Sequence, residues 1–184
     1  IGKSSRSNLI TYLKGFDEIR KLFANQTFSK LNNLTTKHFS FNTDGGRCDR
    51  CKGDGFILID MQFMSDIKIT CEDCKGNRYK DIVLNAYYNK KNIADLLNMT
   101  IDELYVFFKA VNNTKITRYL EPLQKVGLGY VKSGQTLSTL SGGELQRLKL
   151  AFFLNTNLDN SLLIFDEPTT GLHLHDIKKL LNSF

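Results

Sequence analysis

The four cysteines of this chain fall into two pairs whose spacing suits a tetrahedral metal site. The pairs are Cys48-x-x-Cys51 and Cys71-x-x-Cys74, and 19 residues separate them. Each Cys-x-x-Cys pair lets two thiolates approach one ion from a tight turn, and two such turns complete a Zn²⁺ shell with Zn–S bonds of about 2.3 Å. Four sulfur ligands leave no position for a reactive water, so the predicted zinc is structural.

Disulfides and a redox motif are the alternative uses of these thiols. The chain shows no export signal, and disulfides are rare in proteins that stay inside the cell. A redox Cys-x-x-Cys usually occurs once, at the start of a helix. The glycines that follow each pair favour turns whose N–H groups point at sulfur. We therefore predict zinc bound by all four cysteines.

A second group of residues with chemical potential lies in the run Leu-Ser-Gly-Gly-Glu-Leu-Gln-Arg, residues 140–147. Ser141 and Glu144 have the spacing of a capping box, which predicts the start of a helix. Backbone N–H groups at such a start can face a phosphate, and the helix dipole assists. Taken alone, the run is also compatible with an ordinary capped helix. The predicted nucleotide-binding residues are Ser141, Gly142, Gly143, Glu144, Gln146 and, from the segment described next, Asp166.

An apolar run at residues 161–165 ends abruptly in Asp166-Glu167-Pro168. The pattern is typical of a buried parallel strand that delivers carboxylates to its C-terminal edge. Asp166 is suited to hold Mg²⁺ through water, and Glu167 is the predicted catalytic residue that polarises the attacking water. A core strand that merely ends in acidic residues would look the same. The preceding glycine motif makes a nucleotide site the better interpretation.

The elements expected around the cysteines are short. Alternating apolar residues predict a half-buried strand over 56–63 and a returning strand over 67–69, which together form a β-hairpin with zinc at its base. A helical pattern covers residues 16–23, and brief strands are expected at 39–41 and 83–88.

Helices are expected to dominate the rest of the chain. Thr100 and Glu103 form a second predicted capping box. A helix over 115–126 is expected to be kinked or divided by Pro122 and closed by Gly127 and Gly129. A further helix is expected to run from Ser141 to Asn155.

Composition and charge restrict the class of protein. The 184 residues are 41% hydrophobic and 24% charged, which is typical of globular proteins. No apolar run approaches the roughly 20 residues that span a bilayer. The absence of a signal peptide and of an initial Met suggests a piece of a cytoplasmic protein. The net charge of +6 is concentrated in residues 1–47, which hold 8 Lys/Arg against 3 Asp/Glu; this arm could lie near phosphates or be a solvated face.

Both nucleotide motifs, in this order, resemble those of the ABC ATPases. The runs Cys-x-x-Cys-Lys-Gly-Asp-Gly, Cys-x-x-Cys-Lys-Gly-Asn-Arg-Tyr, Val-Gly-Leu-Gly-Tyr (126–130) and Asp-Glu-Pro-Thr-Thr-Gly-Leu-His (166–173) resemble the C-terminal half of the UvrA family over essentially the whole chain. The resemblance implies an α/β fold of mixed α+β content: a helical ABC signature subdomain with an inserted four-cysteine zinc β-hairpin module, and part of the P-loop NTPase core. It also implies four segments: a basic arm that follows the Q-loop (1–47), the zinc module (48–80), the helical signature subdomain (81–140), and the signature helix, Walker B strand and D-loop (141–184).

The same resemblance implies a function. Members of the UvrA family are ATP-dependent damage-recognition subunits of bacterial nucleotide excision repair. The full-length proteins form homodimers that search double-stranded DNA and load a UvrB-like helicase, without a membrane. The implied cofactors are structural Zn²⁺, ATP and Mg²⁺. By this resemblance the Ser141-Gly-Gly turn contacts the γ-phosphate of a nucleotide held by the other ATPase half, Asp166 and Glu167 serve the nucleotide of their own half, and Lys3 and Arg6 are candidate DNA contacts.

Two other functions stay open at this point. One is a UvrA-like paralogue with a role in drug tolerance. The other is a zinc module like the cysteine-rich region of DnaJ chaperones, although that region carries four Cys-x-x-Cys repeats and neither nucleotide motif.

The resemblance also bears on activity. It places Walker A and the Q-loop before this chain and the switch histidine after it, and Gly2-Lys3 has too little chain before it to be tested as a Walker A loop. We therefore expect no ATP hydrolysis by the isolated chain, and surface or packing roles for His173 and His175.

Overall fold

The computed structural model describes residues 7–61, 66–154 and 164. Of the predicted Walker B strand only Ile164 is described, and Asp166, Glu167, Lys3, Arg6, His173 and His175 lie outside the described residues. Chain contacts define two compact units: one is Asp17–Leu96, and the other joins Ile1–Phe16 to Leu97–Phe184. Within the described ranges, none of the helices is long and apolar enough to cross a membrane.

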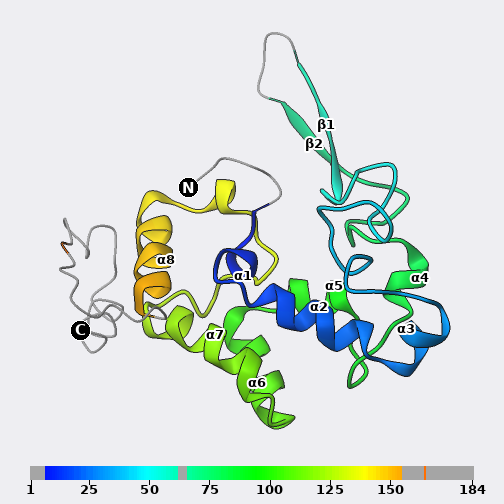
Figure 1. The fold of residues 1–184 in the computed structure, drawn as a ribbon. Helices are drawn as coiled ribbons and strands as arrows, with labels where there is room; N and C mark the ends of the chain where they lie inside the picture. The colour runs from blue at the N-terminus through cyan, green and yellow to red at the C-terminus, as the bar shows by residue number, and fades with distance from the viewer. Residues whose placement is uncertain (1–6, 62–65, 155–163, 165–184) are drawn as a thin grey trace. The chain divides into compact units, whose positions relative to one another are not determined.

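Short helices and one two-stranded sheet make up the described part of the chain, as Figure 1 shows. In order, the elements are α1 (Leu9–Tyr12), α2 (Phe16–Ala24), α3 (Thr27–Leu31), β1 (Phe56–Ile59), β2 (Ile67–Thr70), α4 (Asp81–Leu84), α5 (Ile93–Asn98), α6 (Ile101–Ala110), α7 (Thr114–Lys125), the 3₁₀ turn η1 (Leu137–Thr139) and α8 (Gly142–Leu154).

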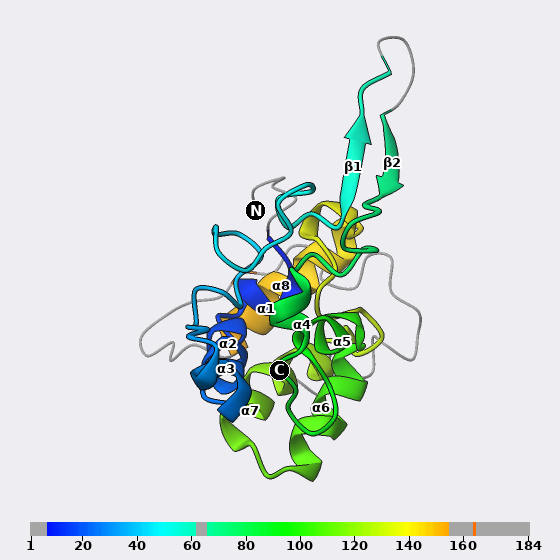
Figure 2. The ribbon, with the colours of Figure 1, turned by 90° about the vertical axis from the view of Figure 1, so that its right-hand side faces the viewer.

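The predicted β-hairpin is confirmed, and Ile57 and Met61 on its apolar face are half-buried as expected, whereas the other isoleucines are exposed. β1 and β2 pair antiparallel with Phe56 opposite Thr70 and Ile59 opposite Ile67. Ile59, Ile67 and Ile69 are 41%, 46% and 47% exposed. The reason is that the described sheet has only these two strands, and Figures 1 and 2 show the hairpin projecting away from the helices of its own unit.

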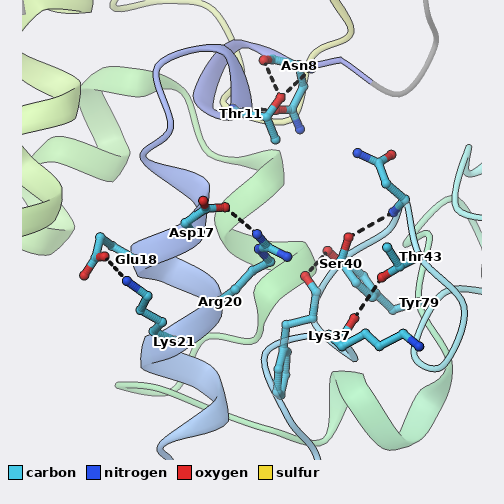
Figure 3. A network of polar contacts seen from close by, with 12 residues as sticks. Asn8, Thr11, Asp17, Glu18, Arg20, Lys21, Lys37, Ser40, Thr43 and Tyr79 are labelled. Carbon is cyan, nitrogen blue, oxygen red and sulfur yellow. Dashed lines mark hydrogen bonds and ion pairs between the residues drawn. The ribbon is translucent and has the colours of Figure 1, made fainter.

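The brief strand predicted at residues 39–41 is wrong, because the chain curls into turns there. The Thr43 hydroxyl donates to the Lys37 carbonyl at 3.2 Å, and the Asn42 N–H donates to Ser40 Oγ at 3.3 Å (Figure 3). Both aromatic side chains of the segment, Phe39 and Phe41, are buried. The conformation of this segment is therefore determined by the packing of two aromatic rings and not by the alternating pattern of a β-strand.

The strand predicted at residues 83–88 is also wrong, because the helix α4 covers its first residues. Asp81 lies in the first turn of α4, where a carboxylate interacts favourably with the helix dipole. Val83 is buried, whereas Ile82 is 45% exposed. The following chain reverses through Asn89 and Lys90, which adopt φ values of 46° and 64°. Two residues of this run, Val83 and Ala86, are buried, and the run does not form a strand.

Three longer helices, α6, α7 and α8, lie in the unit that contains residues 97–154. The predicted capping box at the start of α6 is confirmed: Thr100 Oγ accepts the Glu103 N–H at 3.2 Å, and Glu103 Oε2 accepts the Thr100 N–H at 2.8 Å. The smaller helix α1 of the same unit begins with a capping box of its own, between Asn8 and Thr11 (Figure 3).

α7 continues through Pro122, so the proline does not divide the helix, and the kink stays a prediction. Proline removes the hydrogen bond to the carbonyl four residues earlier, which belongs to Arg118. Arg118 is exposed, so water can satisfy that carbonyl. Gly127 ends the helix as predicted, with φ 76°.

α7 packs against both α6 and α8 (Figure 2). Burial of a Leu, Ile or Phe side chain stabilises a fold by about 1.5–3 kcal/mol, and the interior of this unit contains many such side chains. They include Leu9, Ile10, Ile101, Leu104, Phe108, Ile116, Leu120, Leu123, Leu128, Leu137, Leu148 and Leu150.

Candidate metal centre and nucleotide-binding turn

The structure brings the four cysteine sulfurs into one buried cluster. Their Sγ atoms all lie within 4.8 Å of one another. Cys48 and Cys71 sulfurs are 3.9 Å apart, and Cys51 and Cys74 sulfurs are 3.6 Å apart. A disulfide needs about 2.05 Å, whereas two ligands of a tetrahedral Zn²⁺ with bonds of about 2.3 Å lie about 3.8 Å apart. The donor set and its spacing therefore fit zinc.

Two similar turns position these sulfurs. After Cys51, Lys52 and Gly53 adopt φ values of 51° and 91°; after Cys74, Lys75 and Gly76 adopt 49° and 84°. In the first turn the Asp54 N–H donates to the Cys51 carbonyl at 3.0 Å, and in the second the Asn77 N–H donates to the Cys74 carbonyl at 2.8 Å. The repeated sequence Cys-x-x-Cys-Lys-Gly thus folds twice into the same local geometry.

The hairpin and a second pairing hold the two turns together. The Cys71 N–H donates to the Gly55 carbonyl at 3.0 Å, at the base of the hairpin. On the other side, the Cys48 N–H donates to the Arg78 carbonyl at 2.8 Å, and Arg47 and Tyr79 form an antiparallel bridge. The cluster is therefore enclosed by backbone pairing on both sides.

Charged side chains also link the two turns. Arg50, between the first two cysteines, forms ion pairs with Glu72 at 3.1 Å and Asp73 at 2.8 Å, both between the second two. The hydrogen bond that Arg50 donates to Asp73 raises the pKa of Arg50 further. Lys80 pairs with Asp49 at 2.8 Å. These pairs are exposed, so backbone and sulfur geometry contribute most to the closure of the module.

The thiols differ in their tendency to ionise. Burial raises the pKa of Cys48 and raises that of Cys74 to about 12. Burial acts in the same direction on Cys71, but hydrogen bonds from the Cys74 and Asp73 backbone and from neighbouring thiols outweigh it and lower its pKa. A bound Zn²⁺ must displace the protons of the high-pKa thiols, so zinc affinity increases with pH.

The second candidate site is the first turn of α8, where the predicted capping box is present. The Ser141 N–H donates to Glu144 Oε2 at 2.7 Å, and the Glu144 N–H donates to Ser141 Oγ at 3.3 Å. α8 starts at Gly142, so the two glycines occupy the first helical positions. Their N–H groups have no carbonyl partner within a helix, so they are free of helical hydrogen bonds and could donate to an anion.

Gly142 is not required by the packing of the described chain. A Cβ built on Gly142 meets no atom within 4 Å. By contrast, a Cβ on Gly53 would lie 1.9 Å from the Phe41 carbonyl oxygen. Gly53 is therefore explained by the fold, whereas the space around Gly142 is open to a ligand that approaches the backbone closely.

Two residues that sequence reasoning did not assign also belong to this site. The Tyr130 hydroxyl donates to Glu144 Oε1 at 2.5 Å. The Arg147 side chain is 7% exposed and donates from Nη1 to the Gly127 carbonyl at 3.1 Å. Tyr130 and Arg147 both lie within sequence motifs described above. The motifs do not reveal that Tyr130 contacts Glu144, 14 residues later, or that Arg147 contacts Gly127, 20 residues earlier.

The carboxylate of Glu144 accepts hydrogen bonds from groups within the protein. Burial raises its pKa, but hydrogen bonds from Tyr130 and Ser141 and the nearby Arg147 charge outweigh this, so the pKa is lowered. Burial and the bond to Glu144 raise the pKa of Tyr130. Glu144 therefore stays ionised and shapes the turn, while Gln146, also predicted to bind nucleotide, is half-buried on α8.

The family model described as "ABC transporter" matches residues 55–170, more than half of the 184 residues. The chain therefore belongs to the ABC transporter family.

Within that family, the chain is similar to UvrABC system protein A. The protein of that name from Clostridium tetani is 50% identical over 183 residues, which cover 99% of this chain and 19% of the relative. The Aquifex aeolicus protein is also 50% identical over 183 residues, covering 99% of this chain and 20% of the relative. The chain spans about a fifth of the length of these relatives.

A solved structure agrees with the sequence relatives. The crystal structure of UvrA2 from Deinococcus radiodurans matches with a TM-score of 0.91 and 42% identity, covering 100% of this chain and 22% of that one. The expected fold class is thus confirmed as a mixed helical and small-sheet part of a UvrA-like fold, with four clustered cysteines consistent with a zinc module.

Proposed function

We propose that this chain is part of the ATP-dependent damage-recognition subunit of bacterial nucleotide excision repair. The observation that carries the proposal is the joint presence of a four-cysteine cluster with zinc spacing and an ABC-type helix start in one chain. The identity of 50% to UvrABC system protein A over 99% of the chain supports it. The DnaJ-like alternative loses its support, because the ABC transporter match extends through the second cysteine pair and the glycine motif.

In this function the nucleotide-binding residues have separate roles. Ser141, Gly142 and Gly143 receive the γ-phosphate of a nucleotide held by another ATPase half, at N–H groups favoured by the helix dipole. Gln146 flanks this turn. Asp166 holds Mg²⁺ through water, and Glu167 polarises the water that attacks the γ-phosphate. ATP binding and hydrolysis supply the energy that drives the protein between states with different affinity for DNA.

The zinc module has a structural role in the proposal. Cys48, Cys51, Cys71 and Cys74 hold the ion, and the ion closes the base of a hairpin that is too small to be stable alone. The segments 1–47, 48–80, 81–140 and 141–184 are the corresponding arm, zinc module, helical signature subdomain and ATPase-core segment.

The proposed partners are double-stranded DNA with lesions, a UvrB-like helicase, and a second copy of the full-length protein. Lys3 and Arg6 contact DNA phosphates from the basic arm, and such contacts weaken as salt increases. In this proposal the isolated chain does not turn over ATP, because catalysis also needs the phosphate-binding loop and switch residues of a complete ATPase.

The test is binding of the full-length gene product to damaged and intact duplexes of one sequence, at about 50 and about 200 mM salt, with and without ATP. The proposal expects tighter binding to the damaged duplex and a change in that preference when ATP is added. Equal affinity for both duplexes in both nucleotide states would reject it.

A UvrA-like paralogue with a role in drug tolerance is the second candidate, favoured by the 42% identity to UvrA2 over the whole chain. Affinity capture of a UvrB-like helicase by the full-length gene product separates the two. Stable capture supports the repair subunit, and damaged-DNA binding without capture supports the paralogue.

A further inference from the structure

The start of α8 is connected to the loop that follows α7 by one carboxylate. Glu144 Oε1 accepts the Tyr130 hydroxyl at 2.5 Å, and Glu144 Oε2 accepts the Ser141 N–H at 2.7 Å. Each oxygen therefore has its own donor. A single side chain links the phenol of one segment to the backbone of the glycine turn.

The loop that carries Tyr130 is held on both sides. The Asp102 N–H donates to the Gly129 carbonyl at 2.9 Å, and the Ile101 N–H donates to the Val131 carbonyl at 2.9 Å. Both donors belong to the first turn of α6. The Tyr130 hydroxyl is thus presented to Glu144 from a segment whose flanking residues are hydrogen-bonded to a helix.

Arg147 adds a second connection between α8 and the same loop. Its Nη1 atom donates to the Gly127 carbonyl at 3.1 Å, and its side chain is 7% exposed. The guanidinium also favours the ionised form of Glu144. The first two turns of α8 are therefore attached at two points to residues 127–130.

We propose that Tyr130 is a positioning residue that acts through Glu144 to fix the Ser141-Gly142-Gly143 turn in the orientation in which its N–H groups receive a phosphate. This inference depends on the proposed ATPase function of the parent protein. Tyr130 does not touch the nucleotide. Tyr130 is 58% exposed, so it contributes little to the core, and its hydroxyl bonds to Glu144.

The inference predicts a particular kinetic effect. The substitution Tyr130→Phe removes the hydroxyl and leaves the Ser141–Glu144 capping box able to form. The helix should therefore persist while the turn becomes less well oriented. Because the turn acts on a nucleotide bound elsewhere, the loss should appear in kcat and not in KM. We expect kcat to fall about tenfold, since small misplacements of a catalytic group have large effects.

The experiment compares four variants of the full-length gene product: Tyr130→Phe, Glu144→Ala, the double variant, and Tyr87→Phe. Tyr87 is a matched control, because it is 53% exposed. Steady-state ATP turnover gives kcat and KM, and thermal unfolding gives Tm. We expect Tyr130→Phe to lower kcat about tenfold with KM within about twofold and Tm unchanged. The double variant should match Glu144→Ala alone, because Tyr130 acts through Glu144.

Three results would overturn the inference. They would leave the proposed function intact, provided that the wild-type protein hydrolyses ATP. They are a wild-type kcat for Tyr130→Phe, a double variant whose losses add, and a fall in Tm that accompanies the loss of kcat in Tyr130→Phe. Absence of ATP turnover in the wild-type protein would instead reject the proposed function, and the inference with it.

Discussion

The sulfur atoms of Cys51 and Cys74, which are 23 residues apart in the sequence, lie 3.6 Å apart in the structure. The hairpin β1–β2 lies between them in the chain, and its exposed isoleucines contribute little burial to its own stability. A two-stranded hairpin of this size is marginally stable in water. Closure of the module must therefore come from its sulfur ligands and from the backbone pairing around them.

Gly53→Ala should destabilise the zinc module. The new Cβ would lie 1.9 Å from the Phe41 carbonyl oxygen, and the backbone φ of 91° disfavours alanine. We expect a loss of about 1–3 kcal/mol in the free energy of unfolding and faster zinc transfer to a chromogenic chelator.

Gly76→Ala provides the matched control for that change. Gly76 has a similar φ of 84°, but a Cβ there meets only Thr70 Cγ2, at 3.6 Å. The difference between the two variants isolates the clash with Phe41. If Gly53→Ala is no less stable than Gly76→Ala, the packing of the first turn against residues 39–41 is not as described.

Gly142→Ala should separate function from folding. A Cβ at this position meets nothing within 4 Å, and alanine favours helix, so Tm should not fall. In the full-length gene product we expect ATP turnover to fall by about tenfold or more, because a methyl group blocks the close approach of a phosphate. Turnover equal to wild type would show that no ligand approaches the backbone here.

Tyr79→Phe should weaken the attachment of the two cysteine turns to the segment that precedes them in the chain. Tyr79 is 1% exposed, and its hydroxyl donates to the Phe39 carbonyl at 3.0 Å. Removal of this donor leaves a buried carbonyl without its partner and should cost about 1–3 kcal/mol in urea unfolding. The exposed Tyr87→Phe should have no such effect, and an equal loss in both variants would contradict the assignment.

The capping carboxylate should give stability a defined pH dependence. Hydrogen bonds hold the pKa of Glu144 below its ordinary value of 4.5. Its stabilising contribution is therefore complete above about pH 4.5 and is lost as the pH falls through the lower, folded-state pKa. Because the group is partly screened by solvent, we expect at most about 1 kcal/mol.

The measurement is the difference in unfolding free energy between wild type and Glu144→Gln, taken at pH 7 and again near pH 3. The wild-type advantage should be larger at pH 7. An advantage that grows on acidification would mean that the folded state favours the protonated carboxyl.

Local patterns predicted local features of this chain well. Capping boxes depend on residues three apart, and both Thr100–Glu103 and Ser141–Glu144 form as expected. The hairpin follows from alternation over a few residues and a turn. The clustering of the cysteines follows from the geometry of Cys-x-x-Cys turns.

Features that depend on distant contacts could not be predicted. Phe39 and Phe41 both turn inward because other aromatic side chains, including Phe23 and Tyr79, pack on them, which alternation cannot reveal. The Tyr130–Glu144 contact depends on a loop folding back onto α6. The exposed hairpin face differs from expectation because burial needs a second layer, and strand patterns do not show whether one exists.

The zinc module is the central claim, and the most direct test is metal analysis of the purified chain together with a count of its free thiols. We predict one zinc ion per chain and thiols that become reactive only when a chelator removes the metal. A chain without bound metal, with its thiols oxidised in pairs, would contradict the claim.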